Sequence, residues 1–560
     1  MASCDISSSP ESSDIETDEE FDDDSSESGS DFDQDDSDSD HSFGSETDSD
    51  DNQDTNSTLF DLDSQASDIR DSDFWTDVVE DFDVPDFVDA SGPTHQLSSD
   101  ANPLLYFLLL FPLSLVQVLV DNTNSYAAQS GAQGWTDTTI DEMKAFLGLQ
   151  ILMGIIQLPR YTMYWSSDKF IGNIGFQETL SLKRFEKLTR YFHLSDNTTQ
   201  GARGTPEFDR LHKIRPVLDE TRRTFRSQMN PPKQQAIDEG MVKYKGRFFA
   251  RQYMPNKPVK RGFKIFMRCD EDGYCYDYWP YMGKHDFFHG KSLGERVVKH
   301  LCRPLKYKGH HVFFDRFFTS ISLVRTLLQN GIFSCGTIKS DSEGFPPELR
   351  NPDLRRGETL QMQHDQLLAT AWKDKKTVHI LSTNCSPFGD GPVVRRTRGG
   401  NFVEVMCPPP VSAYQRYMSG VDRCMQHRAK NPVGRPSKKY WKFFFNFIME
   451  VCLINAFEIF SRTPGKDLPA KTRFDLLDFR MEVAQQLIGG FRGRKRGHHL
   501  QGILDPPHVF CHLDRLKSTC KWCTKHGEKK RKETVYGCKG CNKHLCSERC
   551  FREFHSDVNL

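Results

Sequence analysis

The chain has 560 residues, enough for three or four domains, and its formal net charge of −5 conceals a strong polarity. Residues 1–100 contain 34 Asp and Glu residues and one basic residue, Arg70, which leaves 44 acidic and 72 basic residues for the remainder. An acidic tail of charge −33 therefore precedes a body of charge +28. This distribution excludes a uniformly acidic soluble enzyme and favours a body that binds a polyanion, for which nucleic acid is the best fit.

The cysteines indicate the cellular compartment. Seven of the 16 lie between Cys511 and Cys550, and the other nine are scattered. The segment Met1–Pro10 has neither the basic start nor the apolar core of a secretory signal. We therefore expect a reducing compartment rather than a disulfide scaffold.

The tail is rich in Asp, Ser and Glu, and such a segment buries too little apolar surface to offset the entropy of ordering. We predict that residues 1–100 are disordered. Two short apolar patches, Phe74-Trp75 and Val84–Val88, are candidate partner-binding segments. The interpretation we favour is a solvated tail that screens the basic body.

Helices are predicted to open the body. The apolar stretch 104–120 contains Pro112 and Gln117, lacks flanking basic residues and is at the lower limit of length for a membrane span. It is interpreted as a buried helix, with a membrane span as the alternative. Apolar residues at helical spacing predict further helices over 139–158, 180–193 and 211–228.

After Pro231-Pro232 the pattern changes to short apolar or alternating runs punctuated by Gly, Asp and Pro, which predicts strands. The whole chain is thus predicted to be an α/β multidomain protein. The predicted strands are 235–242, 263–269, 274–278, 311–314, 332–338, 360–364, 367–372, 377–381 and 402–406, and the helices are 294–302, 322–330, 438–460 and 474–487.

Three aspartates stand in distinctive settings. Asp238 lies inside a predicted strand, Asp315 directly follows another, and Asp422 precedes a long predicted helix. A carboxylate on an apolar strand is costly to bury unless it is paired or binds metal. Two such carboxylates on neighbouring strands and a third from a helix suit two divalent cations for phosphodiester chemistry, with Mg²⁺ preferred by oxygen ligands. Spacing alone does not decide this, since three aspartates within 185 residues are ordinary.

The residues around the aspartates add a resemblance. The stretches IDEGMVKYKGRFFARQYMPNKPVKRGFKIFMRCDEDGYCYDYWPY, FFDRFFTS and YQRYMSGVDRCMQ resemble, in this order, the three catalytic motifs of the piggyBac transposase family and its domesticated vertebrate derivatives. Outside them, FLLLFPLSLVQVLVDNTNSYA, FLGLQILMGIIQLPRYTMYW, RFEKLTRYFHLSDN, DRLHKIRP and WKDKKTVHILST also match. The resemblance runs from about Leu104 to about His555.

The resemblance implies an RNase H-like core in which Asp238, Asp315 and Asp422 form a catalytic triad that holds Mg²⁺ or Mn²⁺. It implies cutting and joining of double-stranded DNA at transposon ends and TTAA targets, by a nuclear protein, a homodimer with no membrane association. The implied parts are a disordered acidic tail (1–100), a helical DNA-binding and dimerisation domain (101–232 and 432–500), the core (233–339 and 409–431), a β-rich insertion domain (340–408) and a zinc-binding domain (506–557).

Two positions depart from the family pattern. A further Asp usually stands three residues after the third catalytic one, where this chain has Met425, and Asn usually stands where this chain has Arg316. Three hypotheses therefore stay open: an active transposase, a domesticated derivative that binds DNA without cutting it, and a zinc-mediated protein-interaction factor.

The C-terminal segment contains ligands of the kind and spacing that bind zinc. Paired Cys-x2-Cys units hold Zn²⁺ through thiolates, and two full sites need eight ligands. His508 or His512 could complete the set, of which we select His512, and His526 is a spare candidate. The family suggests two interleaved sites, and a RING or PHD module is the alternative. The predicted ligands are Cys520, Cys523, Cys538, Cys541, Cys546, Cys550, His555 and His512.

Several basic and aromatic residues are candidate DNA contacts. The run Arg492–Arg496 is typical of a nuclear localisation signal or a phosphate-binding patch, and otherwise of an exposed loop. Gly434-Arg435-Pro436 resembles an AT-hook core or makes a tight turn, and Trp441 either stacks on a base or lies in the core. The predicted DNA-binding residues are Lys257, Lys260, Arg261, Lys264, Arg435, Lys438, Lys439, Trp441, Arg494, Lys495 and Arg496.

Overall fold

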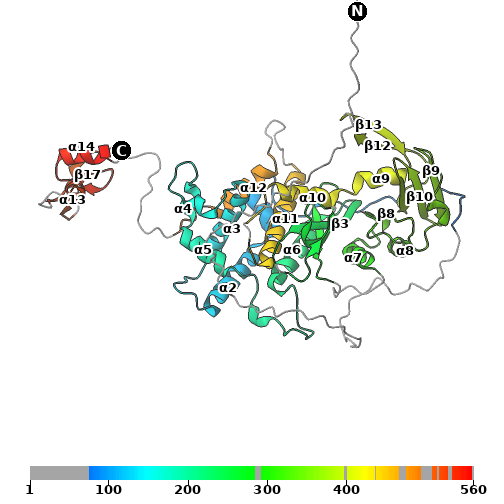
Figure 1. Ribbon diagram of the computed structural model, residues 1–560, viewed down its shortest axis with the longest axis horizontal. Helices are drawn as coiled ribbons and strands as arrows, with labels where there is room; N and C mark the ends of the chain where they lie inside the picture. The colour runs from blue at the N-terminus through cyan, green and yellow to red at the C-terminus, as the bar shows by residue number, and fades with distance from the viewer. Residues whose placement is uncertain are drawn as a thin grey trace, which may run out of the picture. The chain divides into compact units, whose positions relative to one another are not determined.

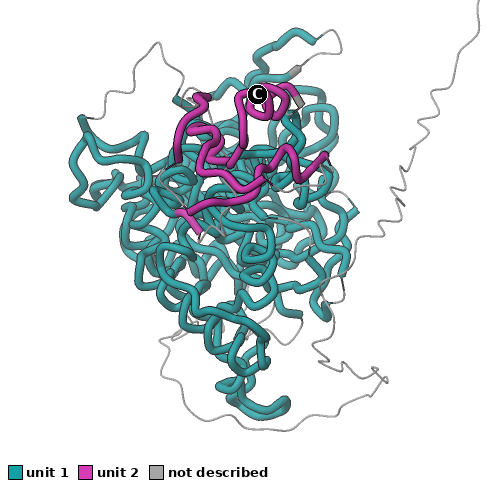
Figure 2. Tube along the Cα trace, turned by 90° about the vertical axis from the view of Figure 1, so that its left-hand side faces the viewer, with its two compact units in different colours: residues 1–491 teal, residues 492–560 magenta. Residues whose placement is uncertain are grey.

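The computed structural model describes residues 75–557 except 247, 256, 284–291, 397–399, 435–436, 466–473, 494–507, 514–515 and 527–531. Two compact units are present, residues 1–491 and 492–560 (Figure 2). Several predictions fall outside the described residues: the first 74 residues of the tail, the Gly-Arg-Pro turn at Arg435, and the basic residues Arg494, Lys495 and Arg496.

The first predicted helix is two helices. Helix α1 (Pro103–Leu110) ends before Pro112, and α2 (Leu113–Gln129) begins after it, with an angle of 67° between them. Proline has no N–H to donate and its ring clashes with the preceding turn, so the helix breaks there. The fully buried side chains of Tyr106, Phe107 and Leu110 fix α1 in the core.

The remaining helices of the first half largely match the prediction. Helix α3 (Ile140–Ile155) starts at Thr139, whose side chain accepts a hydrogen bond from the Glu142 backbone. Helices α5 (Leu182–Tyr191) and α6 (Arg215–Ser227) follow, together with a short helix that the sequence did not predict, α4 (Ile174–Thr179).

Helices from the two ends of the body share one core. Helix α11 (Tyr440–Arg462) packs against α1 and α6, and α12 (Leu476–Ile488) packs against α3 (Figure 1). Gly148 of α3 permits this approach, because a Cβ there would lie 2.7 Å from the Ala484 carbonyl oxygen. By length and composition α11 could cross a membrane, as could the bent α1–α2 pair taken together, but 83% of the apolar window of α11 is buried within the fold.

A nine-stranded sheet lies beside these helices. It runs β4 (Gln252–Tyr253), β5 (Arg261–Cys269), β3 (Gln234–Lys243), β7 (His311–Phe314), β8 (Phe333–Thr337), β11 (Thr377–Ser382), β10 (Leu367–Lys373) and β9 (Thr359–His364), and β6 (Cys275–Pro280) also pairs with β5. Strands β3, β7 and β8 are parallel, and the other pairs are antiparallel.

The two faces of the sheet are covered by different helices. On one face, α7 (Leu293–Cys302) and α8 (Ile321–Gln329) pack against Ile237, Val312 and Phe314. On the other face, α9 (Pro409–Tyr417) contacts Phe313 of β7 through the ring of Tyr417, and α10 (Gly420–Lys430) packs on β3.

The predicted β-rich insertion domain at 340–408 is joined to the core sheet. Strand β11 pairs with β8 through Ile380↔Thr337, so β9, β10 and β11 extend the core sheet rather than forming a sheet of their own. The free edge of β8 offers backbone groups that β11 satisfies. Within the described part of this region, β12 (Gly391–Arg396) and β13 (Phe402–Cys407) form a separate hairpin. Strand β12 was not predicted.

The disorder predicted for residues 1–100 extends too far along the chain. Residues 75–100 lie on the body: Trp75 Nε1 donates to the Gly344 carbonyl (2.9 Å) and Thr76 pairs with Gln363 on the edge strand β9. Phe87 contacts the His310 ring at 4.9 Å, and β1 (Gly92–Pro93) pairs with β2 (Met229–Asn230). Trp75 and Phe87, in the regions proposed to bind a partner, thus contact their own chain, where aromatic burial offsets the cost of ordering.

The C-terminal unit is small. Its sheet contains β14 (Phe510–His512), β17 (Tyr536–Cys538) and β18 (Lys543–His544), beside the pair β15 (Ser518–Thr519) and β16 (Glu533–Thr534). Two helices, α13 (Lys521–Lys525) and α14 (Glu548–Asp557), accompany them. The buried cluster consists of four cysteines and Leu545. So small a core requires additional cross-links, for which metal ions are the usual solution in reducing compartments.

Candidate active site and metal sites

Strand register places two of the three aspartates side by side. Ile237 of β3 pairs in parallel with Phe314, the last residue of β7, so that Asp238 is the next residue of β3 and Asp315 directly follows β7. Residues opposite each other in a sheet face the same side. The backbone N–H of Phe317 donates a hydrogen bond to Asp315 Oδ1 (2.9 Å). This bond holds the carboxylate just beyond the end of β7.

Helix α10 supplies the third aspartate, Asp422, in its first turn. The helix lies so close to the strands that a Cβ at Gly420 would collide with the Asp270 carbonyl and lie 3.4 Å from the Ala236 Cβ. The ammonium group of Lys257 interacts electrostatically with the carboxylates of all three aspartates. Burial lowers the pKa of Lys257, but the charges of Asp238, Glu239 and Asp422 outweigh it and raise that pKa.

The carboxylates at this site are crowded. Burial, followed by the charge of Glu239, raises the pKa of Asp238 to about 7, although Lys257 and the Glu239 N–H oppose the rise. Burial and Glu239 also raise the pKa of Asp315, against the hydrogen bond from Phe317. Such perturbed groups are characteristic of functional sites.

Glu239 was not among the predicted residues, yet it belongs to this cluster. Its side chain is 6% exposed, with Oε1 3.5 Å from Lys257 Nζ and Oε2 3.9 Å from Lys264 Nζ. Its place in the sequence, directly after Asp238 on an apolar strand, was the signal that could have identified it. Lys264, a predicted DNA contact, is instead buried, with its ammonium 4.1 Å from the centre of the Phe317 ring.

The acidic residues fit a divalent cation. Buried carboxylates whose ionisation is suppressed by their neighbours are stabilised by an added positive charge, and their oxygens suit Mg²⁺ or Mn²⁺. Among the residues that the structure describes, His, Cys, Asp and Glu ligand atoms converge to within 4.8 Å in groups of three or more only in the C-terminal unit. The oxygens of the three aspartates do not form such a group in this structure.

Met425 stands where the resemblance predicts a further carboxylate. One turn after Asp422, its side chain lies over Gly240 of β3, where a Cβ would be 2.8 Å from the Met425 sulfur. It is partly buried against the core. Arg316, the other departure, is exposed beside Asp315.

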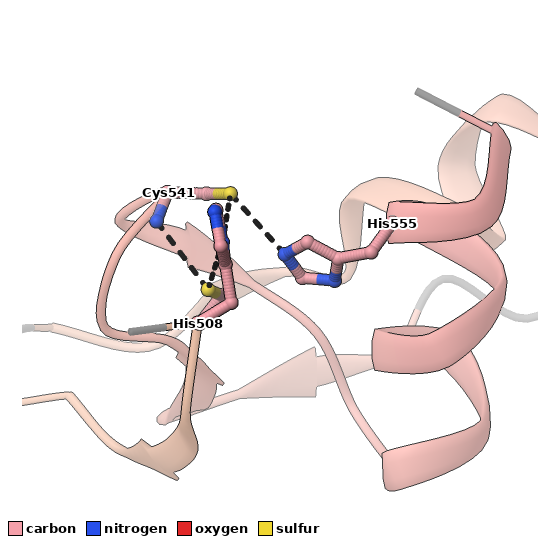
Figure 3. A group of neighbouring side chains, drawn as sticks. His508, Cys541 and His555 are labelled. Carbon is pink, nitrogen blue, oxygen red and sulfur yellow. Dashed lines mark hydrogen bonds between the residues drawn. The ribbon is translucent and has the colours of Figure 1, made fainter. Parts of the chain in front are cut away.

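Eight ligands in the C-terminal unit form two groups. One contains His508, Cys538, Cys541 and His555, and the other contains Cys520, Cys523, Cys546 and Cys550. Figure 3 shows the rings of His508 and His555 pointing at the Cys541 sulfur, at 3.1 and 3.2 Å. In the second group three sulfur pairs lie 3.6–3.7 Å apart. A tetrahedral site with Zn–S bonds of about 2.3 Å requires sulfurs about 3.8 Å apart.

The structure corrects one ligand and supports the interleaving of the two groups. His512 is exposed and its ring lies beside Tyr536 at 5.5 Å, while His508 takes the fourth position. The spare candidate His526 stacks on Trp522, at 3.7 Å between the ring centres. The backbone N–H groups of Cys541 and Cys546 donate to the sulfurs of Cys538 and Cys520, both at 3.3 Å, as they would to thiolates.

The predicted DNA contacts separate into two sets. Trp441 is 3% exposed and packs against Phe192 and His193, so its proposed stacking on a base is wrong and the core alternative holds. Lys260 and Arg261 are exposed on the β4–β5 hairpin. Lys438 is exposed and Lys439 half-buried at the start of α11.

Comparisons with known proteins agree with this architecture. A family model described as Transposase IS4 matches residues 102–457. The chain belongs to the piggyBac-type transposase family. Human PiggyBac transposable element-derived protein 5 is 26% identical over 74% of this chain and 81% of its own length, and human PiggyBac transposable element-derived protein 2 is 28% identical over 69% and 65%.

A solved structure shares the fold. The cryo-EM structure of a piggyBac transposase synaptic complex with hairpin DNA superposes with a TM-score of 0.64 and 24% identity, covering 82% of this chain and 98% of that one. This similarity confirms a mixed α/β fold for the chain.

Proposed function

We propose that the chain acts on double-stranded DNA as a piggyBac-type transposase, with Asp238, Asp315 and Asp422 as its catalytic residues. The observation that carries this proposal is the register Ile237↔Phe314, which sets Asp238 and Asp315 on adjacent parallel strands beside the helix that bears Asp422. The strand order β6-β5-β3-β7-β8, with β3, β7 and β8 parallel, supports an RNase H-like core.

The chemistry follows from the site. Divalent cations bound by the three carboxylates would supply activation of the attacking oxygen and stabilisation of the leaving oxygen. The Phe317 N–H donates a hydrogen bond that positions the Asp315 carboxylate. The Glu239 N–H does the same for Asp238, at 2.7 Å. Water and then a 3′-OH would be the nucleophiles, with transposon ends and TTAA sites as substrates and a nuclear homodimer as the working form.

The C-terminal unit would hold two Zn²⁺ ions and contact DNA. Its two ligand groups have the donor types and spacings of structural zinc sites. Lys521, Lys525 and Lys532 lie on the same unit and supply charge of the sign that phosphate requires.

The experiment is cleavage of DNA fragments that carry candidate terminal repeats beside TTAA, with Mg²⁺. The wild-type chain should release 3′-OH ends, while Asp315→Ala should lose at least about a thousandfold in rate because a metal ligand is removed. Retained cleavage by Asp315→Ala would refute the assignment of the site.

A second function, DNA binding without cleavage, is favoured by one observation. The thioether of Met425 fills the place where the family has a carboxylate. If the wild-type chain binds the ends tightly but leaves them intact at every Mg²⁺ and Mn²⁺ concentration, this alternative replaces the first.

A further inference from the structure

A lysine occupies the acidic site. Lys257 Nζ lies 3.4 Å from Asp238 Oδ2, 3.5 Å from Glu239 Oε1 and 3.4 Å from the Glu239 carbonyl oxygen. Its side chain is 26% exposed, so Lys257 is partly buried against the carboxylates and still in contact with solvent. It therefore stands where a cation bound to Asp238 would share the same oxygen.

The second lysine of the site differs in its surroundings. Lys264 Nζ is 3.9 Å from Glu239 Oε2 and lies over the rings of Phe266 and Phe317, at 4.9 and 4.1 Å. A buried ammonium held between aromatic faces and a carboxylate is fixed in place. If Lys257 moved away, Glu239 would keep Lys264 as a partner, whereas Asp238 would have lost its nearest positive charge.

The location of Lys257 gives it an alternative partner. It lies in the connection between β4 and β5, where the exposed side chains of Lys260 and Arg261 follow within four residues. Arg261 is stacked over the Tyr253 ring at 5.2 Å. A phosphate backbone that docks on these exposed charges comes within a side-chain length of Lys257, since an extended lysine reaches about 6 Å from its Cα.

We propose that Lys257 is a displaceable counter-ion, a positioning residue that neutralises Asp238 in the DNA-free chain and transfers to a DNA phosphate when DNA docks on the β4–β5 hairpin. Its departure frees Asp238 for a divalent cation, so DNA binding and metal loading favour each other. This inference rests on the proposed function, because it assigns the cation to Asp238. By linkage, DNA must tighten metal binding by the same factor by which metal tightens DNA binding.

The test measures Mn²⁺ binding to the zinc-loaded full chain by the EPR signal of free Mn²⁺. Four proteins are compared without DNA: wild type, Lys257→Met, Lys260→Met and Asp238→Asn. Lys260→Met is the matched control, because it removes the same charge from the same connection at an exposed position. We expect Lys257→Met to tighten Mn²⁺ binding about tenfold and Lys260→Met by less than about threefold, as the charge nearest the ligand has the larger effect.

The same Mn²⁺ titrations are repeated with a DNA duplex of random sequence. The Mn²⁺ bound in the presence of Asp238→Asn is subtracted, because it measures binding by the DNA and by other sites of the protein. DNA should tighten Mn²⁺ binding to the wild type several-fold and leave Lys257→Met nearly unchanged. Loss of a structural ion pair cannot produce this pattern, since a destabilised site binds metal more weakly.

The outcomes separate the two proposals. Binding that depends on Asp238 but is equal or weaker in Lys257→Met overturns the counter-ion role and leaves the proposed function standing. If Asp238→Asn binds Mn²⁺ as the wild type does in every condition, the metal site itself is wrong, and this inference falls with it.

Discussion

Asp238 is an acid whose environment opposes its own ionisation. Its pKa is raised from the usual value near 3.8 to about 7 by burial and by Glu239. Because the folded chain holds this proton between about pH 4 and pH 7 while the unfolded chain releases it, stability from this residue is present at low pH and is lost as pH rises through that window. A site that is unfavourable when empty is suited to a bound cation.

The first prediction tests whether the ionised Asp238 destabilises the metal-free fold. Asp238→Asn should raise the free energy of unfolding of the metal-free acidic site at pH 8 by on the order of 2 kcal/mol, and by much less at pH 5. Urea unfolding of the two zinc-loaded full-length proteins measures it, since contributions that they share cancel in the difference. A variant less stable than the wild type at pH 8 would contradict the account. Adding Mg²⁺ should stabilise the wild type and leave the variant unchanged.

The second prediction concerns Met425. An Asp at this position would lie one turn from Asp422 and against Gly240, two residues from Asp238. Met425→Asp should therefore lower the Mg²⁺ concentration for half-maximal cleavage, at a cost of about 1–3 kcal/mol in stability from burying a charge. Met425→Leu is the control that keeps the packing. Identical Mg²⁺ dependence in the two variants would show that three carboxylates suffice.

At the scale of elements, short apolar strands were predictable and their partners were not. Strand β7 and its helices α7 and α8 match the predicted ranges within one residue, because Gly, Asp and Ser punctuate them. That β11 pairs with β8, and so joins the strands of the expected insertion domain to the core sheet, depends on backbone edges that no local pattern encodes. Lys264 and Trp441 were predicted to contact DNA, and both are buried, because charge and aromatic character alone do not reveal burial.

The zinc ligands show the same limit. Spacing identified the six cysteines and His555, yet His508 and His512 are four residues apart and only the fold selects between them. The third prediction follows: His508→Ala should lose at least one of two Zn²⁺ ions per chain, and His512→Ala should retain both. Elemental analysis of the purified full-length proteins measures this. Loss of zinc from His512→Ala alone would reverse the assignment.

For the whole molecule, charge is the dominant feature. Residues 1–74 carry 27 acidic residues and one basic residue, while the rest of the chain is strongly basic. Because residues 75–100 make contacts with the body, we expect only residues 1–74 to compete with DNA for lysine and arginine side chains.

The fourth prediction is that deleting residues 1–74 tightens non-specific DNA binding, most at low salt, where the Debye length is long. The slope of affinity against salt should also steepen, because more phosphate contacts release counterions. Binding isotherms at several salt concentrations measure both. A chain of equal length with the acidic residues of 1–74 replaced by Ser or Asn should behave as the deletion does. Curves identical to the wild type would make the tail a spacer.

The central claim is that residues from β3, β7 and α10 build one divalent-metal site. Anomalous scattering at the manganese edge, from crystals of the chain with duplex DNA and Mn²⁺, tests it most directly. We predict Mn²⁺ within coordination distance of Asp238, Asp315 and Asp422, about 2.2 Å from their oxygens, with Lys257 turned away from Asp238. Manganese bound elsewhere in the body, with none at the three aspartates, would contradict the account.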